Sequence, residues 1–482
     1  VLVAPLFGGL SLNRQHRAIE PAAEGLRKVV LATNIAETSL TIEGVNVVVD
    51  SGLVREAIFD PATGMTRLTT RRISRSSAEQ RRGRAGRLGP GHCYRLWSEE
   101  QQGRLVSHAT PEILQADLAP MALQLLSWGV ENPAELAWLD LPPEAPFGHA
   151  LEMLETCGAV FCNDNGVHQL TPHGVRLAQM PLHPRLAHMI LVGCDIHATE
   201  TACLLAAQLS ERNPLADQGV DVTRALTLLM GENPCPPELE GWFKRTWQQA
   251  RRFARLASEV HKPRRFALEV QPQDILGVLL ASAYPDRVAR LRTPGDGTQY
   301  QLSNGRTAVL PVEDSLAGQP WLAVAEIGGH AGESADRIYS ASEVNPACFS
   351  EILSNLLKLE DQVEWDYRRN QFVAERKTLV GHILLSTEPL EMIPEAARSA
   401  ALLGVIRKKG LDILPWCKNL HQWRARVSRL HRIEVRAGDG ARQWPDLSDQ
   451  GWLDSLEDWW LPYRGEIRRL EEFPRLELKR IL

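Results

Sequence analysis

Short apolar runs rich in β-branched residues alternate with helix-forming stretches at the start of the chain. The runs lie at residues 1–7, 28–33, 45–51 and 92–97 (VLVAPLF, KVVLAT, VNVVVDS and HCYRLW). Strands that alternate with helices are typical of a parallel sheet, because each parallel strand needs a long crossover back to the same edge. The sequence therefore predicts an α/β lobe over residues 1–105, with a parallel sheet covered on both faces.

Two local features refine this lobe. Residues 11–22 predict a helix with Ser11 as its N-cap and an end before Pro21. Residues 54–74 predict two strands around the turn DPATG, inserted after the third apolar run. The outgoing strand of this hairpin is rich in arginine, which is an unusual insertion in an α/β sheet.

Four more segments follow the lobe. Residues 106–180 predict helices and then a small strand pair, which suggests a winged-helix-like module. Residues 181–290 are mostly helical and predict a helical bundle. Residues 291–375 hold short β runs between Gly and Asn turns, the pattern of a small barrel such as an OB-fold. Residues 376–482 predict a mainly helical region rich in tryptophan and arginine, which we expect to be truncated.

Composition restricts the class of protein. Apolar residues make up 44% of the 482 positions, which is enough for several cores. No apolar run approaches the roughly 18 to 20 residues of a membrane span, and no signal segment opens the chain, so we expect a cytoplasmic protein without a membrane partner. The chain opens at Val1 inside a predicted strand, so we expect a fragment of a longer protein. Its eight scattered cysteines suit a reducing compartment, where they are thiols.

Two cysteines and two histidines lie close enough in sequence to invite a zinc interpretation: Cys157, Cys162, His168 and His173. The segment between the pairs is too short for a zinc finger. We therefore expect no metal site here.

The formal net charge of −5 hides two strongly basic stretches. Eight arginines and one acid lie between Arg67 and Arg87, and ten basic residues and two acids lie between Arg398 and Arg436. For the second stretch, a solvated face and a binding surface for an anionic partner remain equal alternatives. The basic, tryptophan-containing stretches 242–256 and 416–436 allow base stacking or ordinary amphipathic packing, and packing is favoured.

Arginines and small residues alternate in the segment QRRGRAGR, residues 80–87. Unpaired buried guanidinium groups would cost several kcal/mol each, so this cluster needs solvent or anionic partners. The planar fork of arginine suits phosphate oxygens, and glycine allows a close approach of ligand and backbone. About 50 residues upstream, Thr33 and Asn34 end one predicted strand, and ligands of α/β sheets bind at such strand ends.

The pair LATNIAETSLTI and QRRGRAGR closely resembles motifs V and VI of DEAH-box helicases, motors of superfamily 2 that use NTP hydrolysis to move along RNA or DNA. The segment LFGGLSLNRQHRAIEPA resembles the region around motif IV. The resemblance implies a second RecA-like lobe, a winged helix, a helical bundle and an OB-fold, in that order. The tail, with LLGVIRKKGLDILPW and WPDLSDQGWLDSLEDWWLPY, resembles the extra C-terminal region of the bacterial HrpB branch of this family.

The resemblance also implies roles for individual residues. Gln80, Arg84 and Arg87 correspond to the catalytic residues near the terminal phosphate, and an arginine finger can contribute ~10³ to 10⁵ in rate. At least one further arginine, Arg81 or Arg82, is expected to hold the loop by pairing with a carboxylate. The nucleotide-contacting positions are Ser39, Thr41 and Glu43, together with Arg84 and Arg87. The nucleic-acid-contacting positions are Gly8, Gly9, Thr33, Thr38, Arg71, Arg72 and Arg75, although strand-end Ser and Thr residues also serve as ordinary helix caps.

The implied cofactors are ATP and Mg²⁺, bound jointly with a first lobe. The chain contains no Gly-Lys and no Asp-Glu dipeptide, and therefore neither a phosphate-binding loop nor a DExH box. We expect this polypeptide to be inactive alone. Ile19 stands where relatives stack an aromatic ring on the base, which predicts weak discrimination among nucleoside triphosphates.

The implied partner is single-stranded or overhang-bearing nucleic acid, with RNA favoured over DNA. The hairpin at 54–74 is expected to act as a wedge or a grip on that strand. The alternative is a nucleic-acid-binding or partner-regulatory module without motor activity.

Overall fold

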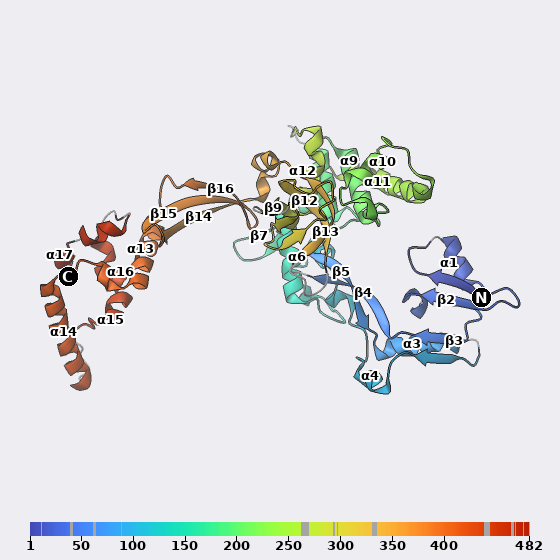
Figure 1. The fold of residues 1–482 in the computed structure, drawn as a ribbon, viewed down its shortest axis with the longest axis horizontal. Helices are drawn as coiled ribbons and strands as arrows, with labels where there is room; N and C mark the ends of the chain where they lie inside the picture. The colour runs from blue at the N-terminus through green and yellow to red at the C-terminus, as the bar shows by residue number, and fades with distance from the viewer. Residues whose placement is uncertain are drawn as a thin grey trace. The chain divides into compact units, whose positions relative to one another are not determined.

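The structure of the chain is a computed structural model that describes every residue except 11, 39–41, 61–63, 88, 262–268, 293, 294, 296, 330–334, 438–443, 464–466, 468, 476 and 482. The chain divides into two compact units, Val1–Leu353 and Ser354–Leu482, and each is described by itself. Figure 1 labels the elements of both. No helix among the described residues is both long and apolar enough to cross a membrane.

The predicted strands of the first lobe form parallel pairs. Strand β1 (Leu2–Leu6) pairs with β2 (Lys28–Ala32), and β3 (Val47–Asp50) pairs with β6 (His92–Arg95). The expected single sheet covered on both faces is not found among the described residues, since the two pairs are separate ladders. One helix accompanies each pair, α1 (Leu12–Ile19) at β1 and α3 at β3 and β6, so the remaining faces stay open and several of their valines and leucines are exposed.

The helix predicted for residues 11–22 is α1, which ends before Pro21 as expected. Its predicted cap, Ser11, lies outside the described residues. The remaining helices of the lobe are α2 (Ile35–Thr38), α3 (Arg75–Ala85) and α4 (Glu99–Arg104).

The predicted hairpin is present as β4 (Leu53–Asp60) and β5 (Met65–Arg72), paired antiparallel. The turn end of the hairpin contacts the barrel of the same unit. Met65 is buried in the core of the barrel, and Arg67 Nη2 lies 2.8 Å from Asp336 Oδ1. Because of these contacts the hairpin is supported at both ends.

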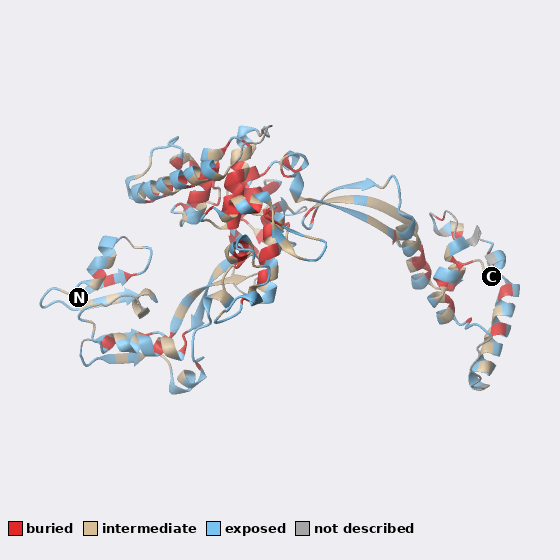
Figure 2. Cartoon of the chain, turned by 180° about the vertical axis from the view of Figure 1, so that it is seen from behind, coloured by how far each residue is buried: buried red, intermediate tan, exposed pale blue. Residues whose placement is uncertain are grey.

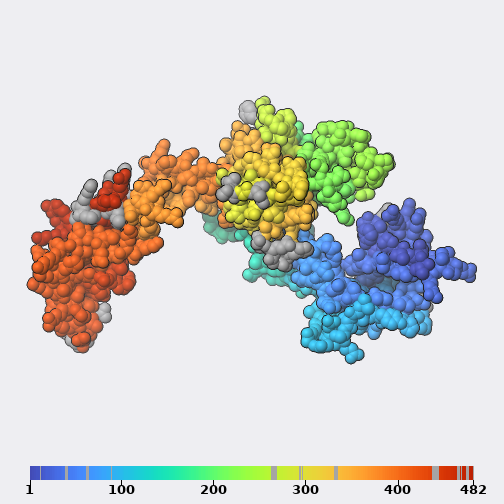
Figure 3. Space-filling model, viewed as in Figure 1, coloured from blue at the N-terminus to red at the C-terminus, as the bar shows by residue number. Residues whose placement is uncertain are grey.

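Helices and one small strand pair follow the lobe. The strands β7 and β8 are antiparallel, as expected for residues 106–180. Figure 3 shows the segment drawn in green lying against the segment drawn in yellow. In the same unit α12 (Ile275–Ala283) packs on the barrel strands β12 (Trp321–Gly328) and β13 (Asp336–Glu343). The elements are α5 (Ala119–Ser127), α6 (Glu144–Thr156), β7 (Val160–Cys162), β8 (His168–Leu170), α7 (Pro172–Ala178), α8 (Pro184–Asp195), α9 (Thr199–Ser210), α10 (Thr223–Leu229), α11 (Glu240–Val260) and α12 (Ile275–Ala283).

The barrel closes in the order β10-β11-β13-β12-β9. Its strands are β9 (Val288–Leu291), β10 (Gln299–Leu302), β11 (Thr307–Val309), β12 (Trp321–Gly328) and β13 (Asp336–Glu343). Side chains such as Tyr300, Leu322 and Ile338 fill its interior and are fully buried. The predicted range 291–375 therefore runs well past the last barrel strand.

The second unit opens with three antiparallel strands, so the expectation of helices from residue 376 is wrong for its first part. They are β14 (Leu357–Asp366), β15 (Gln371–Val380) and β16 (Ile383–Pro389). The helices that follow are α13 (Glu395–Lys409), α14 (Lys418–Ala437), α15 (Asp449–Asp454), α16 (Leu456–Trp459) and α17 (Leu478–Ile481). Their core includes Trp460 and Phe473, which stack at 6.0 Å between ring centroids.

The basic, tryptophan-containing helices pack amphipathically, as favoured. On α11, Trp242 is buried and the indole of Trp247 donates a hydrogen bond to the carbonyl of Leu229 at 2.7 Å. On α14, Leu420 and Val427 are buried in the core of the second unit. Figure 2 nevertheless shows most of α14 in the exposed colour.

Candidate functional site

A carboxylate on α2 is the centre of a polar network at the strand ends. Glu37 Oε2 accepts a hydrogen bond from Arg81 Nε on α3 at 3.0 Å, and Glu37 Oε1 accepts another from the hydroxyl of Ser77. Arg81 Nη1 also donates to Asp50 Oδ1 at 2.9 Å and to the carbonyl of Leu53 at 3.1 Å. Because both carboxylates are largely buried, Arg81 is the cation that lets them remain there.

Arg84, one turn after Arg81, is bound to the backbone of α2. Its Nε donates to the carbonyl of Glu37 at 2.9 Å, and its Nη2 donates to the same oxygen. The side chain is half-buried. This contact fixes the guanidinium at the C-terminal end of α2, where helix carbonyls lack intrahelical partners.

Gln80 lies on the same side of α3 as Arg84, four residues before it, and Arg87 follows two residues after the last residue of the helix, Ala85. Both are exposed and form no hydrogen bond or ion pair with a described residue. The structure thus places Gln80 and Arg84 on one side of α3 and Arg87 just beyond its end, and leaves Gln80 and Arg87 free for a ligand.

Arg82 faces solvent. Its side chain is 63% exposed and pairs with Glu79 at 2.7 Å. The hydrogen bond from Arg95, together with the charge of Arg82, lowers the pKa of Glu79. The expectation that Arg81 or Arg82 holds a carboxylate is therefore met by Arg81 within the lobe.

Two glycines allow the chain to make this network. Gly52 follows β3 with φ +70°, and a Cβ there would lie 2.7 Å from the ring of Trp97. Gly91 follows α3, and a Cβ there would lie 2.1 Å from the carbonyl oxygen of Ala85. A larger residue at either place would force α3 and the neighbouring strands apart.

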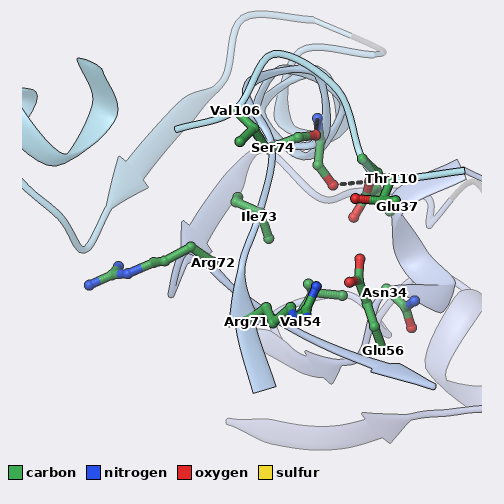
Figure 4. Close-up of a pocket in the computed structure, with 12 residues that line it drawn as sticks. Asn34, Glu37, Val54, Glu56, Arg71, Arg72, Ile73, Ser74, Val106 and Thr110 are labelled. Carbon is green, nitrogen blue, oxygen red and sulfur yellow. Dashed lines mark hydrogen bonds between the residues drawn. The ribbon is translucent and has the colours of Figure 1, made fainter. Parts of the chain in front are cut away.

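A pocket of about 610 Å³ opens beside the network, between the end of β2, the base of the hairpin and the segment after α4. Figure 4 shows Glu37 and Glu56 pointing toward each other across it, with Arg72 directed away from the centre. Its lining residues are Asn34, Glu37, Val54, Glu56, Arg71, Arg72, Ile73, Ser74, Ser77, Val106, Ala109 and Thr110.

The three hairpin-side arginines separate in the structure. Arg71 and Arg72 are exposed and line the pocket. Arg75 begins α3 and instead donates a hydrogen bond to the carbonyl of Gly103 at 2.5 Å. The structure therefore brings only two of the three to the pocket.

The other predicted contact residues lie at the same strand ends. Gly8 and Gly9 follow β1, and Thr33 follows β2 with its amide bonded to the carbonyl of Leu6 at 3.1 Å. Glu43 is exposed in the turn before β3. Thr38 ends α2, and its side chain is not described. The predicted positions Ser39 and Thr41 lie outside the described residues.

The residue that organises the site, Glu37, has no role that its sequence pattern predicts. Glu37 lies within the quoted motif, but a glutamate in a short helix carries no signal of its own. Only the packing of α3 against α2 shows that Glu37 bonds to Ser77, Arg81 and Arg84 together. Glu56 and Thr110 of the pocket were missed for the same reason, since they come from distant segments.

Among the residues that the structure describes, no group of three or more His, Cys, Asp or Glu could hold a metal ion. Cys157 is buried, which raises the pKa of its thiol to about 11, while Cys162 is exposed. His173 faces His188 rather than the cysteines, with Nε2 and Nδ1 2.8 Å apart.

Comparison with known proteins agrees with this picture. The family "Helicase conserved C-terminal domain" matches residues 1–89, and the family "ATP-dependent RNA helicase HrpB, connector region" matches residues 356–390, which hold β14 to β16. The ATP-dependent RNA helicase HrpB of Escherichia coli is 36% identical over 100% of this chain and 55% of its own length. The probable ATP-dependent RNA helicase DHX34 of Mus musculus is 37% identical over 52% of this chain and 22% of its own length.

Solved structures give the same result. A crystal structure of the E. coli DExH-box NTPase HrpB matches with a TM-score of 0.69 and 35% identity, over 100% of this chain and 55% of that one. A crystal structure of the Escherichia coli DEAH/RHA helicase HrpB matches with a TM-score of 0.70 and 33% identity, over 100% and 56%. The chain spans about half the length of these HrpB proteins. The chain is therefore homologous, over its whole length, to part of the HrpB-type DEAH-box RNA helicases.

Proposed function

We propose that this chain is part of an ATP-dependent helicase that couples NTP hydrolysis to movement along nucleic acid, with RNA as the favoured substrate. The observation that carries the proposal is the placement of Arg84 at the strand ends, with Gln80 exposed on α3 and Arg87 exposed just after the helix ends. Homology to part of the HrpB-type DEAH-box RNA helicases supports it, since the relatives bear the names of ATP-dependent RNA helicases.

We propose the following division of the chain. Residues 1–105 are a second RecA-like lobe, 106–180 a winged-helix module and 181–287 a helical bundle. Residues 288–353 are an OB-like barrel, and the remainder is an HrpB-type region. The first boundaries follow the sequence pattern, and the later ones follow the closed barrel and the separate three-stranded sheet.

In this proposal the side of α3 that carries Gln80 and Arg84, together with Arg87 just after the helix, faces the terminal phosphate of ATP. Two guanidinium groups and one amide are suitable donors for phosphate oxygens, and two of the three side chains are unpaired among the described residues. Mg²⁺ would neutralise phosphate charge and would be held by the first lobe. The arginines favour the closed arrangement because only there do they meet the phosphate, so hydrolysis removes that preference.

The pocket beside Glu37 is the proposed contact for the nucleic-acid backbone, with Asn34 and the hairpin arginines Arg71 and Arg72 as donors. Glu37 lines this pocket and also holds Arg81 and, through its carbonyl, Arg84. A shift of α2 on RNA binding would therefore move Arg84. Because the hairpin is anchored at its end, a grip on the strand is favoured over a free wedge.

The test measures RNA-stimulated ATPase activity of the full-length protein with Arg87→Ala. We expect a loss of about 10³-fold with RNA binding retained, because Arg87 makes no contact with a described residue that folding would need. Arg82→Ala, a neighbouring exposed arginine, is the control and should keep wild-type activity. Equal activity in both variants would remove Arg87 from catalysis. A full-length protein without any ATPase activity would favour the non-motor binding module.

A further inference from the structure

Helix α14 (Lys418–Ala437) has two sides of different character. Leu420 and Val427 pack into the core of the second unit, and Arg424 bonds to the carbonyl of Leu447 at 2.8 Å on that side. At 100° per residue, the opposite side collects five basic side chains, all of them exposed. We call this the α14 basic face, and it consists of Lys418, Arg426, Arg429, Arg432 and Arg436.

The α14 basic face has no acidic partner among the described residues. None of its five side chains forms an ion pair with a described residue. Glu434, the one acid of the helix, lies on the other side, where its carboxylate accepts a hydrogen bond from the amide of Trp444. The positive charge of this face is therefore not neutralised by its own surroundings.

This pattern does not favour the stability of the helix. Arg426 and Arg429, Arg429 and Arg432, and Arg432 and Arg436 are like-charge neighbours at three or four residues, an arrangement that disfavours helices. Lys418 lies in the first turn, where the helix dipole favours an acid. The chain has 59 acidic residues, but none within α14 lies on the same side as these arginines to relieve the repulsion.

Some basic residues elsewhere in the chain, unlike this row, are paired with acids. On α11, Lys244 pairs with Glu240 at 2.7 Å one turn away. On the sheet of the second unit, Arg376 pairs with Asp361 on the adjacent strand at 2.7 Å. The uncompensated row on α14 is thus a feature of that face, and its chemistry suits an anionic ligand.

We propose that the α14 basic face binds the phosphate backbone of single-stranded RNA. From Arg426 to Arg436 the row presents a cation every three or four residues, about 4.5 to 6 Å apart along the axis and over roughly 15 Å, and Lys418 lies about two turns earlier. A regular line of cations fits a regular polyanion. Trp423, one turn before Arg426, packs on Trp452 of the core at 6.4 Å between ring centroids, so the proposed contact depends on the cations alone.

This site goes beyond the proposed function, because it lies in the second unit and shares no residue with the pocket beside Glu37. It gives the HrpB-type region a second contact with the same polymer. Two weak contacts on one strand raise the overall affinity, since the second binding event becomes intramolecular.

The test is fluorescence anisotropy of the 482-residue chain with a fluorescein-labelled 20-nucleotide oligouridine, between 50 and 200 mM KCl. In the variant R429Q/R432Q/R436Q, three lost phosphate contacts should reduce the slope of log K against log salt by about 2 and weaken binding roughly tenfold or more. R429K/R432K/R436K keeps the charge and should retain most of the slope. Circular dichroism checks that both variants keep α14 folded.

The matched control removes three positive charges from mixed-charge positions in the same unit: K358Q/R368Q/R369Q. Lys358 lies 2.7 Å from Glu360, and Arg369 lies 3.8 Å from Asp366, so neither belongs to a free basic row. We expect this control to bind within about twofold of the unmodified chain, because removal of distant charges has only a screened effect. Equal binding by the control and the α14 glutamine variant would overturn the proposal.

Three further outcomes separate the alternatives. If the α14 glutamine variant loses affinity for poly-glutamate but not for RNA, the face binds an acidic protein and the proposal is wrong. If R71Q/R72Q loses RNA binding while the α14 glutamine variant does not, the pocket proposal stands and this one fails. If only the α14 glutamine variant loses RNA binding, this proposal stands and the pocket proposal fails.

Discussion

Replacing Arg81 with methionine tests whether the buried ionic network holds the first lobe together. Methionine keeps most of the side-chain volume but removes the only described cation between Glu37 and Asp50. The Asp50 side chain is 1% exposed and would keep one hydrogen bond, from the amide of Gly52 at 2.9 Å. Breaking a buried pair by removing one partner costs about 3 to 5 kcal/mol, so the local stability should fall by that amount.

Arg82→Met is the matched control, one residue away on the same helix. Arg82 is 63% exposed and pairs with Glu79, which is 44% exposed, so its loss should cost about 0 to 1 kcal/mol. Hydrogen exchange followed by mass spectrometry measures both variants on peptides from α3 and β3. We expect exchange to be roughly 100-fold faster or more in Arg81→Met, since a tenfold change corresponds to about 1.4 kcal/mol.

A third variant separates charge from packing. Glu37→Gln and Asp50→Asn added to Arg81→Met remove the stranded charges and should restore part of the protection. Equal exchange in Arg81→Met and Arg82→Met would refute the reasoning. A triple variant no better than Arg81→Met would show that packing, and not charge, dominates.

Three other perturbations follow from the first unit. Burial, together with the charge of His173, lowers the pKa of His188 from 6.5 to about 3. Because the unfolded chain then binds a proton that the folded chain does not, the free energy of unfolding should fall as the pH drops below 6.5, by about 2 kcal/mol at pH 5. A series of thermal melts at different pH values measures this fall, and His188→Phe should flatten it. Gly52→Ala should destabilise the lobe by more than 1 kcal/mol in urea unfolding, because φ +70° and the ring of Trp97 both oppose a Cβ, whereas Gly103→Ala, with open space around it, should not. Asp336→Asn weakens the ion pair with Arg67 and should speed tryptic cleavage of the hairpin; unchanged cleavage would mean that Met65 alone anchors it.

The local pattern of the sequence was sufficient to predict most helices and strands. The apolar runs at 1–7, 28–33, 45–51 and 92–97 became the strands of two parallel pairs, and the two hairpin strands pair as expected, while residues 61–63 of the predicted turn lie outside the described residues. The segment QRRGRAGR lies at the end of a helix, α3, and the resemblance to DEAH-box helicases agrees with the family comparisons. These features depend on residues close together in the chain, so the sequence carries them directly.

Long-range pairing was less predictable. The sheet of 357–389 was missed because its strands mix charged residues with few apolar ones, and both faces of much of it are exposed. The barrel was expected, but its end at Glu343 depends on which strands close it, and periodicity does not encode closure.

The sequence by itself determined the elements, the resemblance to DEAH-box helicases and the residue types able to meet phosphate. Only the tertiary structure decided which arginine is held and which is free: Arg81 is enclosed by two carboxylates, Arg84 is bound to a backbone carbonyl, and Arg87 is exposed. All three stand within one short motif and have the same charge. Their difference comes from the carboxylates that other segments bring near, because burial and ion pairing depend on distance in space and not on distance along the chain.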